Sequence, residues 1–214
     1  MTPQQPIIEL RQALVSDSAS LAELTLLSGE NLLTNAFGGN RRDALLAIEC
    51  LTRTWGTMFS FQMATVASDA SDPQGEPLGV VIAHPSSSER QAGQRLAEVI
   101  VRQRGLWRWL RMLPVSLALE RCSEPIPRNV TYVSILAVVP DKRCAGIGTK
   151  LLRSAEQHAA QLGDNKVCLD VEVDNVRGIA FYERNGYRTV TEHAASSFLR
   201  SRGIVGLRRV EKFL

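Results

Sequence analysis

The stretch from residue 130 to residue 163 constrains the fold of this chain more than any other part of the sequence. Val130 to Val139 reads VTYVSILAVV, a nearly unbroken apolar and β-branched run that is typical of a buried central strand. Pro140 ends that run, and from Thr149 the apolar residues recur at the 3.6-residue period of a helix. Gly163 predicts the end of this helix. The sequence therefore predicts a strand, a glycine turn and a helix.

The glycine turn, residues 143–149, reads RCAGIGT. A turn between a buried strand and a helix directs successive backbone N–H groups and the positive helix end at one spot, which favours phosphate. It is not a Walker loop, because that motif needs GxxxxGK[ST], whereas Gly148 is followed by Thr149 and Lys150. It is not a dinucleotide fingerprint either, because GxGxxG would need glycine where Leu151 stands. A plain tight turn remains the alternative interpretation.

The first third of the chain alternates strand and helix signals. Ile7 to Leu14 predicts a strand, and Asp17 stands where the N-cap of a following helix is expected. Gly29 to Asn40 is rich in turn residues and predicts an apolar loop, after which a second helix runs through Leu51. Phe59 to Val66 and Leu78 to Ala83 then predict an antiparallel hairpin.

Residues 84–129 predict a basic, amphipathic helical insert with a kink at Pro114. This segment has eight Arg and four Glu, although the whole chain carries only +3 from 25 basic and 22 acidic residues. Our favoured interpretation is that Trp107 and the leucines cover the core while the arginines face solvent. The alternative is docking on a membrane or an acidic partner, with Trp107, Trp109, Arg104, Arg108 and Arg111 at the contact.

The last third predicts three more strands and a short helix. Lys166 to Asp174 alternates, with one apolar face and one polar face that carries Asp170 and Glu172. A helix from about Val176 to Arg184 ends at an Asn-Gly pair, and the next strand begins at Tyr187. Gly203 to Phe213 is expected to close the sheet.

Taken together, these motifs resemble the GNAT superfamily of acetyl-CoA-dependent N-acetyltransferases over residues 130–190. The resemblance rests on the LAVxP strand end, the RxxGxG loop and a downstream Asn and Phe-Tyr-Glu segment, at Leu136–Pro140, Arg143–Gly148, Asn175 and Phe181–Tyr187. It implies an α/β (α+β) fold with a mixed, mostly antiparallel twisted sheet, a splayed strand pair and flanking helices. We expect one domain over residues 1–214, with the insert at about 85–128.

The resemblance also implies where acetyl-CoA is held. Free backbone groups of the central strand would bind the pantetheine arm, and a backbone N–H there would polarise the acetyl carbonyl. The pyrophosphate would lie on the N–H groups of the glycine turn, with Arg143 adding charge. The residues so implied are Leu136, Ala137, Val138, Arg143, Cys144, Ala145, Gly146, Ile147, Gly148, Thr149, Asn175 and Tyr182. Many relatives have basic or amide side chains where this chain has Cys144 and Ala145. Side chains therefore contribute less to pyrophosphate binding here than in those relatives.

The same resemblance assigns the chemistry. Tyr182 matches the general acid that protonates the departing thiolate. Asp170 and Glu172 are the candidates for the general base, with Glu30 as a third, and a solvated acidic strand face is the alternative. The acceptor would meet the loop after the first helix, where Leu32, Leu33 and Phe37 suggest an apolar wall.

The expected function is transfer of an acetyl group from acetyl-CoA to a primary amine of a small molecule or peptide, by direct attack in a ternary complex. A non-catalytic acyl-CoA-binding regulatory module is the alternative. The small net charge disfavours nucleic acid as a partner. No apolar run is long enough for stable membrane insertion, and a cytoplasmic location is expected. The cysteines form no CxxC pair, the histidines show no metal-binding spacing, and a homodimer is left open.

Overall fold

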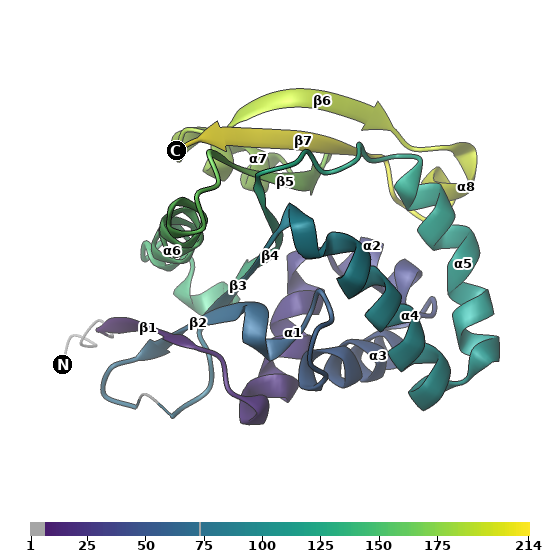
Figure 1. The fold of residues 1–214 in the computed structure, drawn as a ribbon, viewed down its shortest axis with the longest axis horizontal. Coiled ribbons are helices and arrows are strands. Elements are labelled where there is room, and N and C mark those ends of the chain that lie inside the picture. Colours follow the sequence, from purple (N-terminus) through teal and green to yellow (C-terminus); the bar gives the residue numbers. More distant parts are fainter. Residues whose placement is uncertain (1–6, 73) are drawn as a thin grey trace.

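The computed structural model describes residues 7–72 and 74–214, and these residues form a seven-stranded sheet with helices on both faces (Figure 1). The strands lie in the order β1-β2-β3-β4-β5-β7-β6. Their bounds are β1 Ile8–Gln12, β2 Ala64–Asp69, β3 Gly79–Pro85, β4 Thr131–Val138, β5 Lys166–Glu172, β6 Arg188–Ala194 and β7 Gly206–Phe213. The predicted mixed α/β architecture is confirmed.

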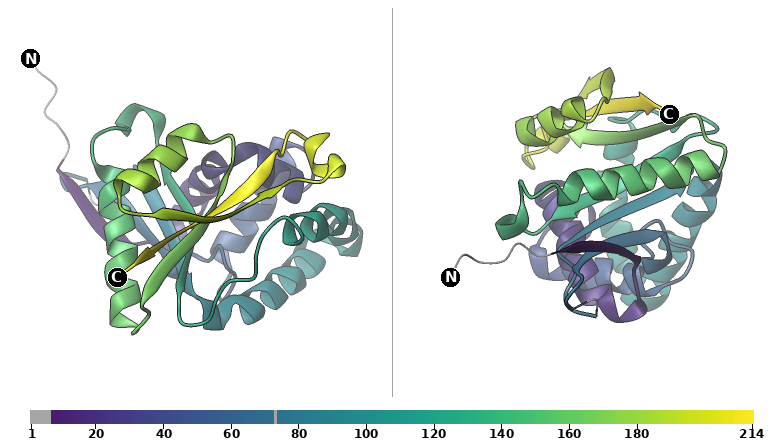
Figure 2. Two further views of the ribbon diagram at one scale, coloured as in Figure 1. Left: turned by 90° about the horizontal axis from the view of Figure 1, so that it is seen from above. Right: turned by 90° about the vertical axis from the view of Figure 1, so that its left-hand side faces the viewer.

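The helices divide between the two faces of the sheet, and each face has its own hydrophobic core. Figure 2 shows α6 crossing one face, with the α4 and α5 pair on the other side. On the α6 face lie α6 Ile147–Gln161 and α7 Val176–Arg184. The opposite face and the adjoining edge are covered by α1 Ser18–Ser28, α2 Glu30–Ala36, α3 Arg41–Arg53, α4 Glu89–Arg104, α5 Leu106–Glu120 and α8 Ser197–Arg200.

The sheet opens between β4 and β5. All other neighbouring strands pair antiparallel, whereas β4 and β5 run parallel and pair only at Thr131 with Val167 and at Tyr132 with Cys168. The register between β3 and β4 shifts just beyond these pairs, and the Ser134 hydroxyl donates to the Ile82 carbonyl oxygen there at 3.3 Å. A bulge of this kind bends a strand. The expected splayed strand pair is therefore present.

Two expectations for the N-terminal region were met only in part. Asp17 occupies the N-cap position of α1, as predicted, but its side chain makes no cap hydrogen bond to that helix. Its carboxylate instead accepts from the Leu14 N–H at 2.7 Å and pairs with Arg11, also at 2.7 Å. The expected loop from Gly29 to Asn40 contains α2, whose residues gain a helical conformation by packing against α3 and α5. The predicted hairpin is confirmed, although its first strand begins at Ala64 rather than Phe59.

The insert is a pair of helices, and its break lies at Gly105 instead of Pro114. Gly105 has a φ of +89°, a value that favours glycine, and it separates α4 from α5. Pro114 lies inside α5. Trp109 packs against the core, but Trp107 is 73% exposed, so the expectation that Trp107 covers the core was wrong.

The last strand does not close an edge of the sheet. β7 lies between β5 and β6 and pairs antiparallel with both, because α8 reverses the chain after β6. Within the described residues, no helix has the length and apolar character needed to cross a membrane.

Candidate functional site

The free edge of β4 forms one wall of the opening in the sheet. Beyond Tyr132, the β5-facing edge of β4 has no strand partner among the described residues. β3 supports the other edge of β4 closely, because a Cβ on Gly79 would lie only 2.8 Å from the Ala137 carbonyl oxygen. Leu136, Ala137 and Val138, which were expected to hold the pantetheine arm, lie on this part of β4. An extended ligand can add to such an edge as a strand does.

The glycine turn directs unpaired backbone donors at the same opening. Cys144 and Gly146 adopt positive φ values of +63° and +78°, and α6 begins directly afterwards at Ile147. The first backbone bond of α6 runs from the Lys150 N–H to the Gly146 carbonyl. The N–H groups of residues 144–149 donate to no acceptor among the described residues. Such a set of N–H groups at a helix N-terminus suits a phosphate.

Arg143 joins the turn back to β4. Its Nε donates to the Val138 carbonyl oxygen at 3.1 Å, and the residue is exposed. The side chain therefore uses one donor to hold the turn, and its terminal N–H groups remain available to an anion.

α7 packs its aromatic residues against the start of α6. A Cβ on Gly148 would lie 3.4 Å from the Phe181 ring, so the small residue allows close contact of the two helices. Asn175 caps α7, because its Oδ1 accepts from the Gly178 N–H at 2.9 Å. Tyr182 is 9% exposed, its ring packs against Tyr187, and its hydroxyl has no partner among the described residues. Burial raises the pKa of Tyr182 far above its ordinary value, so the phenol stays protonated.

Glu172 lies at the end of β5, beside the junction of α1 and α2. Its Oε1 would be 3.4 Å from a Cβ on Gly29, and its carboxylate has no hydrogen bond or ion pair among the described residues. Burial, followed by the nearby charge of Asp174, raises the pKa of Glu172. An unpaired carboxylate with a raised pKa is a stronger proton acceptor than an ordinary one.

The other two candidate carboxylates are bound to arginines. Asp170 accepts from Arg209 at 2.6 and 3.0 Å and from the Tyr132 hydroxyl at 3.2 Å, and the Arg209 side chain is only 3% exposed. Glu30 is exposed and pairs with Arg41 at 3.3 Å. Asp170 and Glu172 lie two residues apart on β5 and share one face, as the alternation predicted. Their hydrogen-bond and ion-pair partners differ.

The residues expected to line the acceptor are mostly core residues. Leu33 and Phe37 are buried, and the Phe37 ring contacts Phe59 edge-on with centroids 5.6 Å apart. Leu32 is partly buried between two clusters of the core. Because this segment is a helix, its apolar side chains face α3 and α5, which corrects the expectation of an open apolar wall.

Sequence reasoning missed Gly29, Gly79 and Arg209. Gly29 carries only a turn signal in the sequence, and its approach to Glu172 joins residues 143 positions apart. Arg209 lies opposite Asp170 in the antiparallel register of β5 and β7, which no local signal predicts.

The comparisons with known proteins agree with this geometry. The family model of the acetyltransferase (GNAT) family matches residues 64–187, more than half of the chain. N-alpha-acetyltransferase 30 of Schizosaccharomyces pombe is 35% identical over 69 residues, which are 31% of this chain and 46% of that protein. Mycothiol acetyltransferase of Geodermatophilus obscurus is 37% identical over 68 residues, which are 32% of this chain and 21% of that protein.

The matched region thus spans less than half the length of either curated relative. An N-acetyltransferase structure from Staphylococcus aureus Mu50 shares the fold at a TM-score of 0.72 and 16% identity, covering 95% of this chain and all of that one. A further acetyltransferase structure matches at a TM-score of 0.69 and 23% identity, covering 96% of this chain and 98% of that one. From the family match and the fold together, this chain belongs to the acetyltransferase (GNAT) family.

Proposed function

We propose that this protein transfers the acetyl group of acetyl-CoA to a primary amine of a small molecule or peptide, by direct attack with both substrates bound. The observation that carries the proposal is the opening between β4 and β5, which brings together a free strand edge, a loop of unpaired N–H groups and an unpaired carboxylate. These are the parts that acyl transfer from an anionic cosubstrate needs.

The described residues fit acetyl-CoA along its length. The backbone of Leu136 to Val138 would bind the pantetheine arm as an added strand. The N–H groups of residues 144–149 and the free donors of Arg143 would hold the pyrophosphate. When bound, acetyl-CoA supplies an activated acetyl thioester. A β4 backbone N–H aimed at the thioester oxygen would stabilise the negative charge that develops there.

Glu172 is the general base in this proposal, acting directly or through one water. Asp170 is the weaker choice, because taking a proton would cost it the ion pair with the buried Arg209 guanidinium. Glu172 has no such partner among the described residues, and it lies beside Gly29, where the acceptor is expected to enter. Tyr182 is the general acid, because a phenol with a raised pKa is protonated and ready to donate to the departing thiolate.

The test measures free thiol released from acetyl-CoA in the presence of pooled primary amines and N-terminal peptides. Wild-type protein should release thiol only when an amine is added. Glu172→Gln should lower kcat/KM by roughly 100-fold, since positioned general bases contribute about that much or more. Because Glu172 must be deprotonated to act, wild-type activity should fall as pH drops through its raised pKa.

Glu30→Gln is the matched control, because it makes the same change in an exposed carboxylate that is paired with Arg41. Its pH profile should follow the wild type. Tight acetyl-CoA binding without release by any amine would favour the non-catalytic module instead. Equal losses in Glu172→Gln and Glu30→Gln would remove Glu172 from the mechanism.

A further inference from the structure

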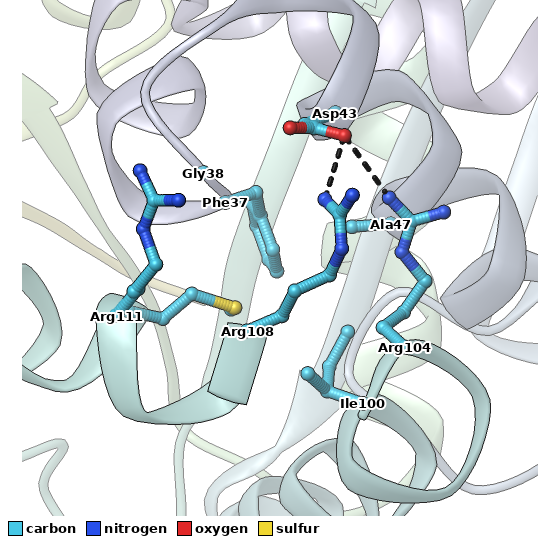
Figure 3. Close-up of a pocket in the computed structure, with 9 residues that line it drawn as sticks. Phe37, Gly38, Asp43, Ala47, Ile100, Arg104, Arg108 and Arg111 are labelled. Carbon is cyan, nitrogen blue, oxygen red and sulfur yellow. Dashed lines mark hydrogen bonds and ion pairs between the residues drawn. The ribbon is translucent and has the colours of Figure 1, made fainter. Parts of the chain in front are cut away.

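A hollow of about 30 Å³ lies between the α2–α3 junction and the helical insert, outside the opening described above. Figure 3 shows its lining side chains, with Arg111 on one side of Phe37 and Arg108 and Arg104 on the other. The hollow is lined by Phe37, Gly38, Asp43, Ala47, Ile100, Arg104, Arg108, Arg111 and Met112. It therefore combines an apolar floor with a strongly basic rim.

One carboxylate forms ion pairs with two of the three arginines. Arg104 and Arg108 both bind the Oδ1 atom of Asp43, at 3.3 and 2.7 Å. The hydrogen bond from Asn40, and then that from Arg108, hold the pKa of Asp43 below its ordinary value, so it stays charged. Arg111 has no carboxylate partner among the described residues. The rim thus keeps two unbalanced positive charges, and most of the guanidinium N–H donors have no partner within the described part of the chain.

The surroundings reduce the solvent screening of these charges. Ile100 and Met112 are buried in the floor and Phe37 is 7% exposed, which keeps water from one side of the rim. The Arg104 side chain is 18% exposed, so its charge is less screened than that of a fully solvated arginine.

We propose that this hollow binds a compact oxyanion, a phosphate monoester, between Arg111 and the Arg104–Arg108 pair. A phosphate monoester at neutral pH carries up to two negative charges, which matches the excess on the rim. Arginine forks bind phosphate oxygens in a bidentate manner, and Phe37, Ile100 and Met112 suit an apolar group on the ester.

This site is separate from the loop proposed for the acetyl-CoA pyrophosphate. The loop starts α6 on one face of the sheet, whereas the insert packs with α2 and α3 on the other. Figures 1 and 2 both place α6 apart from α4 and α5. The insert carries the net positive charge of the sequence, and in this proposal three of its arginines bind the phosphate. The inference does not depend on the proposed acetyl transfer.

The test is calorimetric titration of inorganic phosphate into the full chain at saturating coenzyme A, which blocks the α6 loop. Wild-type protein should bind phosphate, and Arg111→Gln should weaken the affinity at least about fivefold, as expected for loss of a charge-assisted contact. Arg111→Lys should fall between them, because it keeps the charge and loses the fork. Arg121→Gln, an exposed arginine at the other end of α5, is the matched control and should match the wild type.

Arg111 is exposed, so its variants should keep the wild-type melting temperature. Sedimentation with phosphatidylcholine vesicles containing phosphatidic acid then identifies the source of the ester. Arg111-dependent sedimentation assigns a lipid headgroup, and phosphate binding without sedimentation assigns a soluble ester. Absence of phosphate binding by wild-type protein, or equal weakening in Arg111→Gln and Arg121→Gln, overturns the proposal.

Discussion

At the scale of single residues, Asp170 and Glu172 differ only in what the rest of the chain brings to them. Both lie on the polar face of β5, but Arg209 and Tyr132 bind Asp170, whereas Glu172 has no partner among the described residues. The sequence put both carboxylates on the correct face. The sequence could not show which of the two carboxylates is paired, because Arg209 lies 39 positions beyond Asp170.

Tyr182 gives the sharpest test at this scale. Tyr182→Phe keeps the ring that packs against Phe181 and Tyr187 but removes the hydroxyl proton. We expect kcat to fall roughly 100-fold, within the range for a general acid, and the affinity for acetyl-CoA to change little. Stopped-flow or steady-state thiol release, together with equilibrium binding of acetyl-CoA, measures the two effects.

Tyr187→Phe is the matched control, because it makes the same change in the neighbouring buried ring. Its kcat should equal that of the wild type. An unchanged kcat in Tyr182→Phe would exclude the phenol as the proton donor.

At the scale of elements, the site depends on how closely β3 supports β4. Gly79 faces the Ala137 carbonyl, and Leu151 of α6 lies 3.1 Å from the position of an added Cβ. The sequence predicted both strands, but the hairpin pattern gave no sign that one residue had to be glycine for the second strand to approach. The insert shows the same limit, because Gly105 and Pro114 can each interrupt a helix and only the folded chain places the break at Gly105.

Gly79→Ala should therefore destabilise the fold by about 1–3 kcal/mol, the usual range for overpacking. It should also weaken acetyl-CoA binding, because β4 must shift away from β3. Gly93→Ala is the contrasting variant, since a Cβ there would meet no atom within 4 Å and the residue lies inside α4. Helix propensity predicts that Gly93→Ala stabilises the protein by about 0.5–1 kcal/mol. Urea unfolding of both variants measures the free energies, and a stable Gly79→Ala variant with normal binding would contradict the argument.

At the scale of the whole molecule, two cores meet across one sheet that is open at β4 and β5. The helices of the insert complete the core on the side opposite α6. The N-terminal end of α4 adjoins a cavity of about 110 Å³ that is lined in part by His84. His84 is 2% exposed, and its Nδ1 has no hydrogen-bond partner among the described residues. Burial lowers the pKa of His84, and the nearby Pro85 backbone offsets only part of that effect.

This histidine predicts how global stability depends on pH. In the unfolded chain His84 gains a proton below about pH 6.5, whereas the folded protein resists protonation until lower pH. The contribution of neutral His84 to the free energy of unfolding is therefore fully present above about pH 6.5. It is lost as the pH falls toward the pKa of His84 in the folded protein. The slope cannot exceed about 1.4 kcal/mol per pH unit for one group.

His84→Phe removes the titrating group and keeps a ring beside Tyr132, whose centroid lies 5.7 Å from that of His84. The free energy of unfolding should fall less steeply in the variant than in the wild type between pH 6.5 and 5. Chemical unfolding at several pH values gives the difference, in which the contributions of other groups cancel. Parallel curves would show that the pKa of His84 is the same in the folded and unfolded states, which would contradict the prediction.

The sequence by itself determined the parts whose signals are local. The buried run of β4, the glycine turn, the period of α6 and the cap of α7 at Asn175 are all set by residues within a few positions of one another. Tertiary structure alone decided that α2 is a helix, that β7 enters between β5 and β6, and that Asp170 is paired while Glu172 is not. The physical reason is that these outcomes depend on packing and charge partners far away in the sequence, which no local period or propensity encodes.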